Sequence, residues 1–235
     1  MAPDPGTLLA LETASGRGSV ALETGGEIRE RVLPPDRATA ESLLPAIDAL
    51  LAEAGLRLDA VGGFAVSIGP GSFTGLRIGV ATVKGLCFGS DLPVVPVPTL
   101  AALALGAAPG PGPVVAVLDA RRDELYAAGY ADPADPEPDV LAEGLYAGAE
   151  LAERLPAGAR LVGDAAGLSC VPLRRGLAPG VAVQEPGGPA RASDVARLGR
   201  RLLGRQAAGS AGPLVPRYVR RAQAEVLRTG LPTEG

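Results

Sequence analysis

The chain has 235 residues, of which 47% are hydrophobic and 20% are charged, and this is enough to bury one large core or two modest ones. It contains no histidine, which excludes a Ser-His-Asp triad, a Cys-His pair and any histidine-ligated zinc or iron site within the chain. Its net charge of −4 argues against an autonomous nucleic-acid binder, because affinity for RNA or DNA comes largely from cationic side chains that contact phosphates.

The apolar runs and the first residues of the sequence indicate a cytoplasmic location and no membrane association. None of the apolar runs reaches the roughly 18 residues needed to span a bilayer, and the start at Met1–Pro5 lacks the basic residues of a secretory signal. Cys87 and Cys170 stand far apart in apolar surroundings, so we interpret both as reduced core residues.

Three short strands are predicted at the beginning of the chain. Thr7–Glu12 has the composition of a buried strand, and Gly18–Thr24 and Glu27–Leu33 follow it as a meander around a Gly-Gly turn. The turn Glu12–Ser19, between the first two strands, is rich in hydroxyl groups. A plain hairpin and a phosphate-facing hairpin explain this turn equally well.

The segment Ala40–Gly55 has the periodicity of a helix with one wide apolar face. Gly55 is its predicted C-terminal stop. Pro45 fits a regular helix that begins near Ser42, whereas it would kink a helix that begins near Thr39. The apolar positions of this segment are Leu43, Leu44, Ile47, Leu50, Leu51 and Ala54.

The most informative motif is Ser67–Gly79, in which an apolar strand leads into a glycine-rich turn and a helix. The turn Gly69-Pro70-Gly71 provides the backbone angles that a sharp change of direction requires. Ser72 is placed to cap the helix, which is predicted to run to about Ser90. The motif fits neither the dinucleotide fingerprint, whose spacing is shorter, nor a P-loop, because Lys84 is not followed by a hydroxyl residue.

The predicted helix after Ser72 is almost uncharged around its whole circumference, with charges at Arg77 and Lys84 alone. Its glycines would each cost roughly 1 kcal/mol relative to alanine in an exposed helix, so close packing is expected. Two arrangements could bury the surface of this helix: packing against the second lobe of the same chain, or packing of a partner protein against the glycine face. One apolar stripe consists of Phe73, Leu76, Val80, Val83 and Cys87, and a second stripe consists of Gly75, Gly79, Thr82, Leu86 and Gly89.

A Pro- and Gly-rich segment, Ala108–Pro113, is the predicted boundary between two lobes. After it, a buried strand at Val114–Leu118 ends at Asp119, so each lobe opens with a strand, an acidic residue and a hairpin. The remaining predicted elements are strands at Pro93–Val97, Glu124–Tyr130, Arg160–Val162 and Pro213–Arg220, helices at Leu100–Ala107, Ala147–Arg154 and Ala192–Gln206, loops at Asp132–Asp139 and Gly176–Pro189, and frayed last residues.

These motifs together resemble the TsaB (YeaZ) family, the non-catalytic member of the bacterial machinery that makes threonylcarbamoyladenosine at position 37 of tRNA. The resemblance covers most of the chain and is most specific in the block Gly69–Gly79. Most relatives carry Asp at the position of Glu12 and His at the position of Thr39. The supporting motifs are Leu9–Thr13 with Ser19–Leu22, Glu41–Pro45, Asp119–Tyr126 and Pro216–Arg220.

The resemblance implies an α/β, two-lobed actin-like, Hsp70-like and sugar-kinase-like (ASKHA) fold, in which each lobe is a mixed sheet flanked by helices. We expect an N-terminal lobe at 1–107 that carries the dimerisation helices, and a smaller C-terminal lobe at 108–235. The resemblance also implies a heterodimer with the catalytic paralogue TsaD through two helices per subunit, here those near Ser42–Gly55 and Phe73–Ser90. The expected partner interface consists of Leu43, Leu44, Ile47, Leu50, Leu51, Gly75, Arg77, Ile78, Gly79, Thr82 and Leu86.

The same resemblance implies a scaffold without catalytic residues, metal or cofactor, in which Glu12, Thr13, Ser15 and Asp119 are remnants of a nucleotide cleft. The ATPase TsaE would join the assembly, and tRNA would be contacted only through the complex. An uncovered apolar surface would also let the isolated chain form a homodimer.

Two enzymatic functions are alternatives to this scaffold role. One alternative is a small ATP-dependent phosphotransferase of the same fold, with magnesium held by Glu12 and Asp119. Proteolysis is disfavoured, since the sequence lacks histidine and any other nucleophile–base pair.

Overall fold

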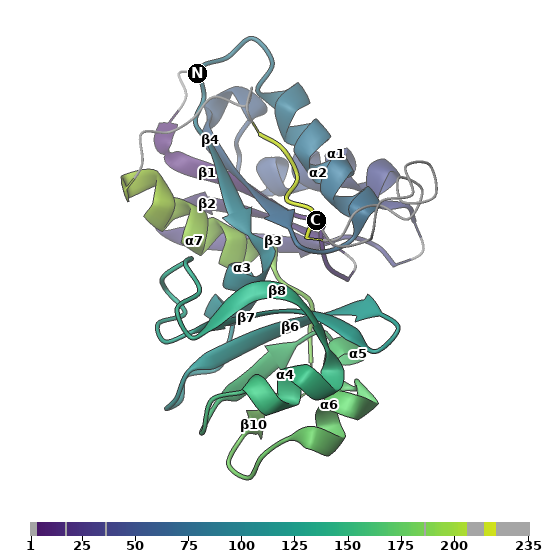
Figure 1. The fold of residues 1–235 in the computed structure, drawn as a ribbon. Coiled ribbons are helices and arrows are strands. Elements are labelled where there is room, and N and C mark those ends of the chain that lie inside the picture. The colour runs from purple at the N-terminus through teal and green to yellow at the C-terminus, as the bar shows by residue number, and fades with distance from the viewer. Residues whose placement is uncertain (1–3, 17, 36, 186, 206–213, 220–235) are drawn as a thin grey trace.

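The computed structural model describes residues 4–16, 18–35, 37–185, 187–205 and 214–219. This part of the chain forms two lobes, one above the other in Figure 1, and each lobe contains one five-stranded mixed sheet. The strand orders are β3-β2-β1-β4-β5 and β10-β9-β6-β7-β8. In both sheets three antiparallel strands are followed by two parallel ones, so the two lobes repeat one topology.

The N-terminal lobe carries its sheet between two layers of helices. The helices α1 and α2 cover one face, where Leu9 and Leu11 point, and α3 and α7 cover the face that contains Leu8 and Ala10. This alternation is the period of two that a strand with both faces buried requires. Its elements are β1 (Asp4–Glu12), β2 (Ser19–Thr24), β3 (Glu27–Val32), α1 (Thr39–Glu53), the 3₁₀ turn Leu58–Ala60, β4 (Val61–Gly69), α2 (Phe73–Leu86), β5 (Val94–Pro98) and α3 (Thr99–Leu105).

The second sheet begins after the predicted boundary segment and has its own small core under α4 and α6. Its strands pair in the register Val115↔Gly129 and Val115↔Leu161, antiparallel and parallel respectively. The elements are β6 (Val114–Arg121), β7 (Glu124–Tyr130), β8 (Leu141–Ala147), α4 (Gly148–Arg154), β9 (Arg160–Gly163), α5 (Ala165–Leu168), α6 (Val171–Gly176), β10 (Ala182–Val183) and α7 (Ala192–Arg205).

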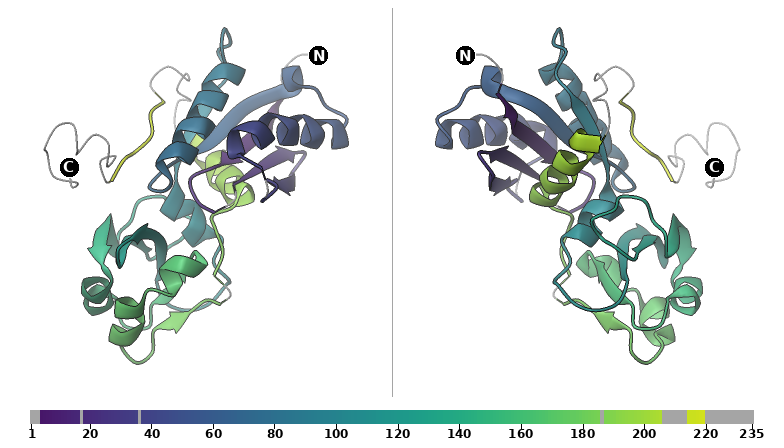
Figure 2. Two further views of the ribbon diagram at one scale, coloured as in Figure 1. Left: turned by 90° about the vertical axis from the view of Figure 1, so that its right-hand side faces the viewer. Right: turned by 90° about the vertical axis from the view of Figure 1, so that its left-hand side faces the viewer.

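Helix α7 returns to the N-terminal lobe, which departs from the expected division at residue 108. It packs against β1, β2 and β4 and belongs to a buried cluster that joins side chains of both sheets. Gly199 allows this close approach, because a Cβ there would lie 2.6 Å from Cβ of Ala65. The lobes therefore share one apolar core at their junction. Figure 2 shows the same two lobes from the side.

Most predicted elements are confirmed, and the differences are local. Helix α1 begins at Thr39, so Pro45 lies inside it, and α2 ends at Leu86 rather than near Ser90, because a turn follows and Gly89 has a φ of 75°. The predicted terminal strand is wrong for residues 214–219, which form no strand, and its ends and the frayed last residues lie outside the described part. Among the described residues, the helices are all too short or too polar to span a bilayer.

Candidate functional site

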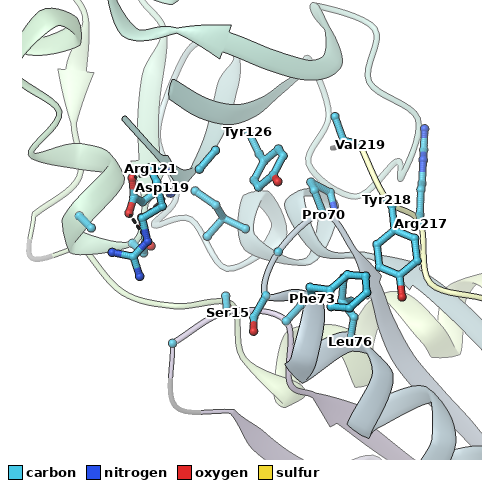
Figure 3. Close-up of a pocket in the computed structure, with 18 residues that line it drawn as sticks. Ser15, Pro70, Phe73, Leu76, Asp119, Arg121, Tyr126, Arg217, Tyr218 and Val219 are labelled. Carbon is cyan, nitrogen blue, oxygen red and sulfur yellow. Dashed lines mark hydrogen bonds and ion pairs between the residues drawn. The ribbon is translucent and has the colours of Figure 1, made fainter. Parts of the chain in front are cut away.

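A cleft of about 560 Å³ lies between the lobes. On one side it is lined by the β1–β2 turn, which includes Ser15, and by the turn before α2 together with Phe73 at the start of that helix. Asp119 and Tyr126 line the opposite side, and the segment 217–219 lines a third (Figure 3). Of the four predicted cleft residues, Ser15 and Asp119 line the cleft, whereas Glu12 and Thr13 do not.

Glu12 lies below the β1–β2 turn and engages the turn with its own carboxyl group. Its side chain is fully buried, and Oε1 accepts hydrogen bonds from the backbone N–H of Ala14 (2.8 Å) and of Ser15 (3.0 Å). Burial raises the pKa of Glu12 to about 8, although the bonds from Ala14 and Ser15 oppose the shift. The two amides that a phosphate-facing turn would offer to a ligand are thus occupied by the chain itself.

Thr13 connects the same turn to α2. Its hydroxyl donates to the carbonyl oxygen of Gly75 at 2.8 Å, and a Cβ on Gly75 would lie only 1.9 Å from the Thr13 carbonyl oxygen. A Cβ on Gly79 would lie 2.3 Å from the Thr13 hydroxyl oxygen. Gly75 and Gly79 therefore face inward, and the interpretation of the glycine stripe as a notch for a partner helix is wrong at these two positions.

Asp119 and Asp164 form the acidic side of the cleft. Asp119 accepts from the backbone N–H of Arg121 at 2.9 Å, and Asp164 accepts from the backbone N–H of Asp119 at 3.2 Å and caps α5 through Gly167. Burial raises the pKa of Asp164, although hydrogen bonds from Gly167 and Asp119 oppose the shift. Asp164 was not predicted as a cleft residue from the sequence. The available signal was its position as the N-cap of a short helix.

The predicted interface residues of α1 are mostly core residues. Leu44 alone among them is exposed, at 50%, because it lies on the side of α1 that faces away from the sheet. The wide apolar face of this helix packs on β2 and β3, within the apolar cluster of the N-terminal lobe, and is not available to a partner. The buried members are Leu43, Ile47, Leu50 and Leu51.

The outer side of α2 carries small and apolar residues beside the two charged residues of the helix, Arg77 and Lys84. Ala81 and Gly85 are exposed, and Phe88, in the turn after the helix, is 92% exposed. The sequence analysis missed these three positions, although their spacing of four and three residues is that of one helix face. We call the following set the α2 face: Leu44 of the adjacent α1 together with Ile78, Ala81, Thr82, Gly85, Leu86 and Phe88.

Arg77 lies at the edge of the α2 face and contacts aromatic side chains of its own chain. Its guanidinium carbon is 3.9 Å from the centre of the Phe73 ring, and its Nε donates to the hydroxyl of Tyr218 at 3.1 Å. The predicted interface role of Arg77 stays a prediction.

Comparisons with known proteins match this fold and these motifs. The family model described as "TsaD: tRNA N6-adenosine threonylcarbamoyltransferase" matches residues 31–160. The TsaB protein of Haemophilus influenzae is 44% identical over 122 residues, which are 51% of this chain and 52% of that protein. TsaB of Escherichia coli is 38% identical over 125 residues, 52% of this chain and 54% of that protein. The chain therefore spans about half the length of the curated relatives it matches.

The similarity to solved structures extends over nearly the whole chain. YeaZ from Pseudomonas aeruginosa superimposes with a TM-score of 0.76 at 31% identity, over 91% of this chain and 99% of that one. A second Pseudomonas aeruginosa structure, titled as similar to peptidase YEAZ, gives a TM-score of 0.77 at 30% identity, over 92% and 100%.

Two mixed sheets of one topology, with helices on their faces and a cleft between them, define a two-lobed protein of the actin-like, Hsp70-like and sugar-kinase-like (ASKHA) class. The chain belongs to the family that the TsaD model describes and, within it, to the TsaB (YeaZ) proteins.

Proposed function

We propose that the chain is a non-catalytic scaffold subunit in threonylcarbamoyladenosine biosynthesis. It docks TsaD through the α2 face, supports transfer of the threonylcarbamoyl group to adenosine 37 of tRNA, and works in the cytoplasm. TsaE joins this assembly, and tRNA reaches the chain through the complex. The names of the Haemophilus influenzae and Escherichia coli relatives support this assignment.

The observation that carries the proposal is the exposed surface of α2. Exposed small and apolar side chains that gather on one surface ordinarily mark an interaction site, and here the described residues leave Ala81, Gly85 and Phe88 open to solvent beside the charged Arg77 and Lys84. Small residues at 81 and 85 let a partner helix approach closely, and Phe88 provides a large apolar side chain of the kind that anchors interfaces. The same face would pair two copies when TsaD is absent.

The phosphotransferase alternative is less well supported by the cleft. A phosphoryl-transfer site holds phosphates with backbone amides at such turns, but Glu12 already occupies the amides of Ala14 and Ser15. Glu12 also has the raised pKa of a carboxyl that stays protonated at neutral pH, which is unsuited to holding magnesium. Calorimetry with magnesium-ATP tests this alternative, and measurable binding to the isolated chain would favour it.

The direct test of docking is Gly85→Leu. No atom lies within 4 Å of a Cβ at Gly85, so the isolated chain accommodates the larger side chain, whereas a closely packed partner does not. Gly79→Leu is unsuitable, because it would collide with Thr13 inside the chain. Gly204→Leu on α7 is the matched control, since its Cβ also meets nothing within 4 Å and it lies on a helix of the opposite layer.

The measurement is titration calorimetry of TsaD with each variant at micromolar concentration. We expect Gly85→Leu to weaken binding at least about tenfold, as overpacking in a tight contact does, and Gly204→Leu to bind like the parent chain. Equal affinities for the parent chain and Gly85→Leu would exclude the α2 face as the docking site. Sedimentation of the three proteins alone tests the homodimer in the same way.

A further inference from the structure

The segment Leu214–Val219 runs from the core of the N-terminal lobe to the edge of the cleft. Leu214 is buried in the apolar cluster of the N-terminal lobe that also contains side chains of α2. The backbone N–H of Arg217 donates to the carbonyl oxygen of Ile68 at 2.7 Å, at the end of β4. Gly69 permits this approach, because a Cβ there would lie 2.4 Å from the Arg217 carbonyl oxygen, and its φ is +121°. The backbone of the segment is thus attached to the N-terminal lobe.

The side chain of Arg217 reaches the other lobe. Its Nε lies 3.1 Å from Oε1 of Glu143, a residue of β8 whose side chain is only 4% exposed. The two groups form an ion pair without the alignment of a hydrogen bond. Burial raises the pKa of Glu143, and the charge of Arg217 opposes that shift. Arg217 therefore contacts both lobes, through its backbone and its side chain respectively. If the segment moved away, the buried carboxyl group of Glu143 would lose its ion pair with Arg217.

Tyr218 attaches the same segment to the first turns of α2. Its ring lies 5.0 Å from the ring of Phe73, measured between centres, and its hydroxyl accepts from Nε of Arg77 at 3.1 Å. Figure 3 shows the Tyr218 and Phe73 rings side by side at the edge of the cleft, and Figure 2 shows the yellow segment beside α2. The position of Arg77 is thus set partly by a residue 141 positions away in sequence.

These contacts are few and mostly exposed to solvent. Tyr218 is 40% exposed, the Arg217 side chain is 53% exposed, and residues 214–219 belong to no helix or strand. Among the described residues, the segment has one backbone hydrogen bond, one side-chain hydrogen bond, one ion pair, one ring contact and one buried side chain. It is expected to open far more often than the sheets unfold, since local stability follows the density of buried contacts. The shared core at the lobe junction does not depend on it.

We infer that residues 214–219 form a releasable clasp, which joins the two lobes at the cleft and holds the N-terminal turns of the docking helix α2 in place. The clasp also couples to partner binding, and this second part rests on the proposed docking through α2. A partner that binds α2 more tightly when the clasp is closed than when it is open must stabilise the closed clasp, because coupling between two sites is reciprocal.

Hydrogen exchange of the full chain, followed by mass spectrometry, tests the clasp. The variants are Tyr218→Ala and Arg217→Gln, and Val215→Ala is the matched control, since Val215 lies in the same segment but is 65% exposed. We expect amides of residues 69–77 to exchange at least about tenfold faster in Tyr218→Ala, from loss of a ring contact and a hydrogen bond, with unchanged rates in β1 and β6. Unchanged rates at 69–77 in both variants, or equal acceleration in β1 and β6, would overturn the inference.

A double-mutant cycle tests whether the Arg217–Glu143 ion pair itself holds the segment, or whether the two substitutions act independently of each other. We expect Arg217→Gln and Glu143→Gln together to accelerate exchange at 214–219 about as much as either alone, because each removes the same ion pair. If the two substitutions have additive effects on the logarithm of the exchange rate at 214–219, the ion pair does not connect the lobes.

The coupling is tested by adding TsaD to the parent chain. Slower exchange at 214–219 in the complex supports it, and binding of TsaD without any change there overturns it. If Gly85→Leu shows that TsaD does not dock on α2, the exchange measurements on the isolated chain still decide whether the clasp exists.

Discussion

The hydroxyl of Thr13 donates a hydrogen bond to the carbonyl oxygen of Gly75, 2.8 Å away and 62 residues later in sequence. This bond joins the turn after β1 to the first turns of α2, and it requires both Gly75 and Gly79 to lack side chains. The relationship decides which side of α2 belongs to the core. It also separates the glycines of this helix into two groups with opposite responses to substitution.

Gly75→Ala and Gly85→Ala are predicted to change stability in opposite directions. At Gly75 the new Cβ would lie 1.9 Å from a backbone oxygen, so the helix must shift, and we expect a loss of about 3 kcal/mol. At Gly85, in the last turn of α2, the Cβ meets no atom outside the local helix backbone within 4 Å, and replacing this glycine should gain up to about 0.5 kcal/mol. Urea unfolding of both variants measures the difference, and a similar response of the two sites would contradict the inward orientation of Gly75.

The contrast between these glycines shows what the sequence predicts well and what it does not. The N-cap is predicted correctly, since the hydroxyl oxygen of Ser72 accepts from the backbone N–H of Gly75 at 3.2 Å. The stripe of Leu76 and Val80 is also a core stripe, as its period indicates. The orientation of Gly75 is different, because it depends on a contact with Thr13 that is distant in sequence, and small residues fit a core as well as an interface.

The sequence did not predict strand β8 or the location of α7, and the residues of these elements explain why. The strand β8, Leu141–Ala147, contains alanine and glycine and lacks β-branched residues, so its sequence has weak strand propensity. Its hydrogen bonds to β7 place it in the sheet. The location of α7 on the N-terminal lobe was also unpredictable from periodicity, which shows that a helix has an apolar face but not which sheet that face covers.

Glu12 is predicted to make stability depend on pH. Its pKa is about 8 in the folded chain and near 4.5 when unfolded, so between these values the folded state keeps a proton that the unfolded state has lost. The stabilisation is complete below pH 4.5 and is lost as the pH rises toward 8, by roughly 3 kcal/mol between pH 5 and pH 8.

Glu12→Gln removes the titrating group but keeps an oxygen acceptor for the amides of Ala14 and Ser15. We therefore expect the variant to lose much less stability than the parent chain when both are unfolded in urea at pH 5, 6.5 and 8. Parallel profiles for the two proteins would mean that Glu12 is ionised in the fold.

Glu30 is predicted to hold the start of α7 on the N-terminal sheet. Its carboxylate accepts from Nε of Arg191 at 3.0 Å, and from the backbone N–H and the hydroxyl of Ser193 at 3.2 and 3.0 Å. Burial alone would raise the pKa of Glu30, but the hydrogen bonds from Ser193 and Arg191 outweigh it and lower the pKa.

Glu30→Gln should cost about 1–3 kcal/mol at pH 7, because it weakens charged hydrogen bonds in a largely buried place. Since the folded pKa is depressed, the stabilisation is present above the unfolded pKa and disappears as the pH falls through the folded one. The variant and the parent chain should therefore converge as the pH falls below the depressed pKa of Glu30 in the folded state. Glu27→Gln on the same strand is the control, as the Glu27 side chain is 72% exposed, and an equal loss in the two variants would argue against this cluster.

Phe88 is predicted to affect association without affecting folding. It is 92% exposed in the turn after α2, so its ring buries little surface within the chain, and Phe88→Ala should change the free energy of unfolding by less than about 0.5 kcal/mol. If the α2 face docks TsaD, the ring becomes buried in the complex, and truncation of such an aromatic anchor costs about 2 kcal/mol or more, which is roughly thirtyfold in affinity. Val171→Ala on α6 is the control, because Val171 is 53% exposed on the other lobe. Calorimetric titration with TsaD compares the two, and equal affinities would place Phe88 outside the interface even if Gly85→Leu blocks docking.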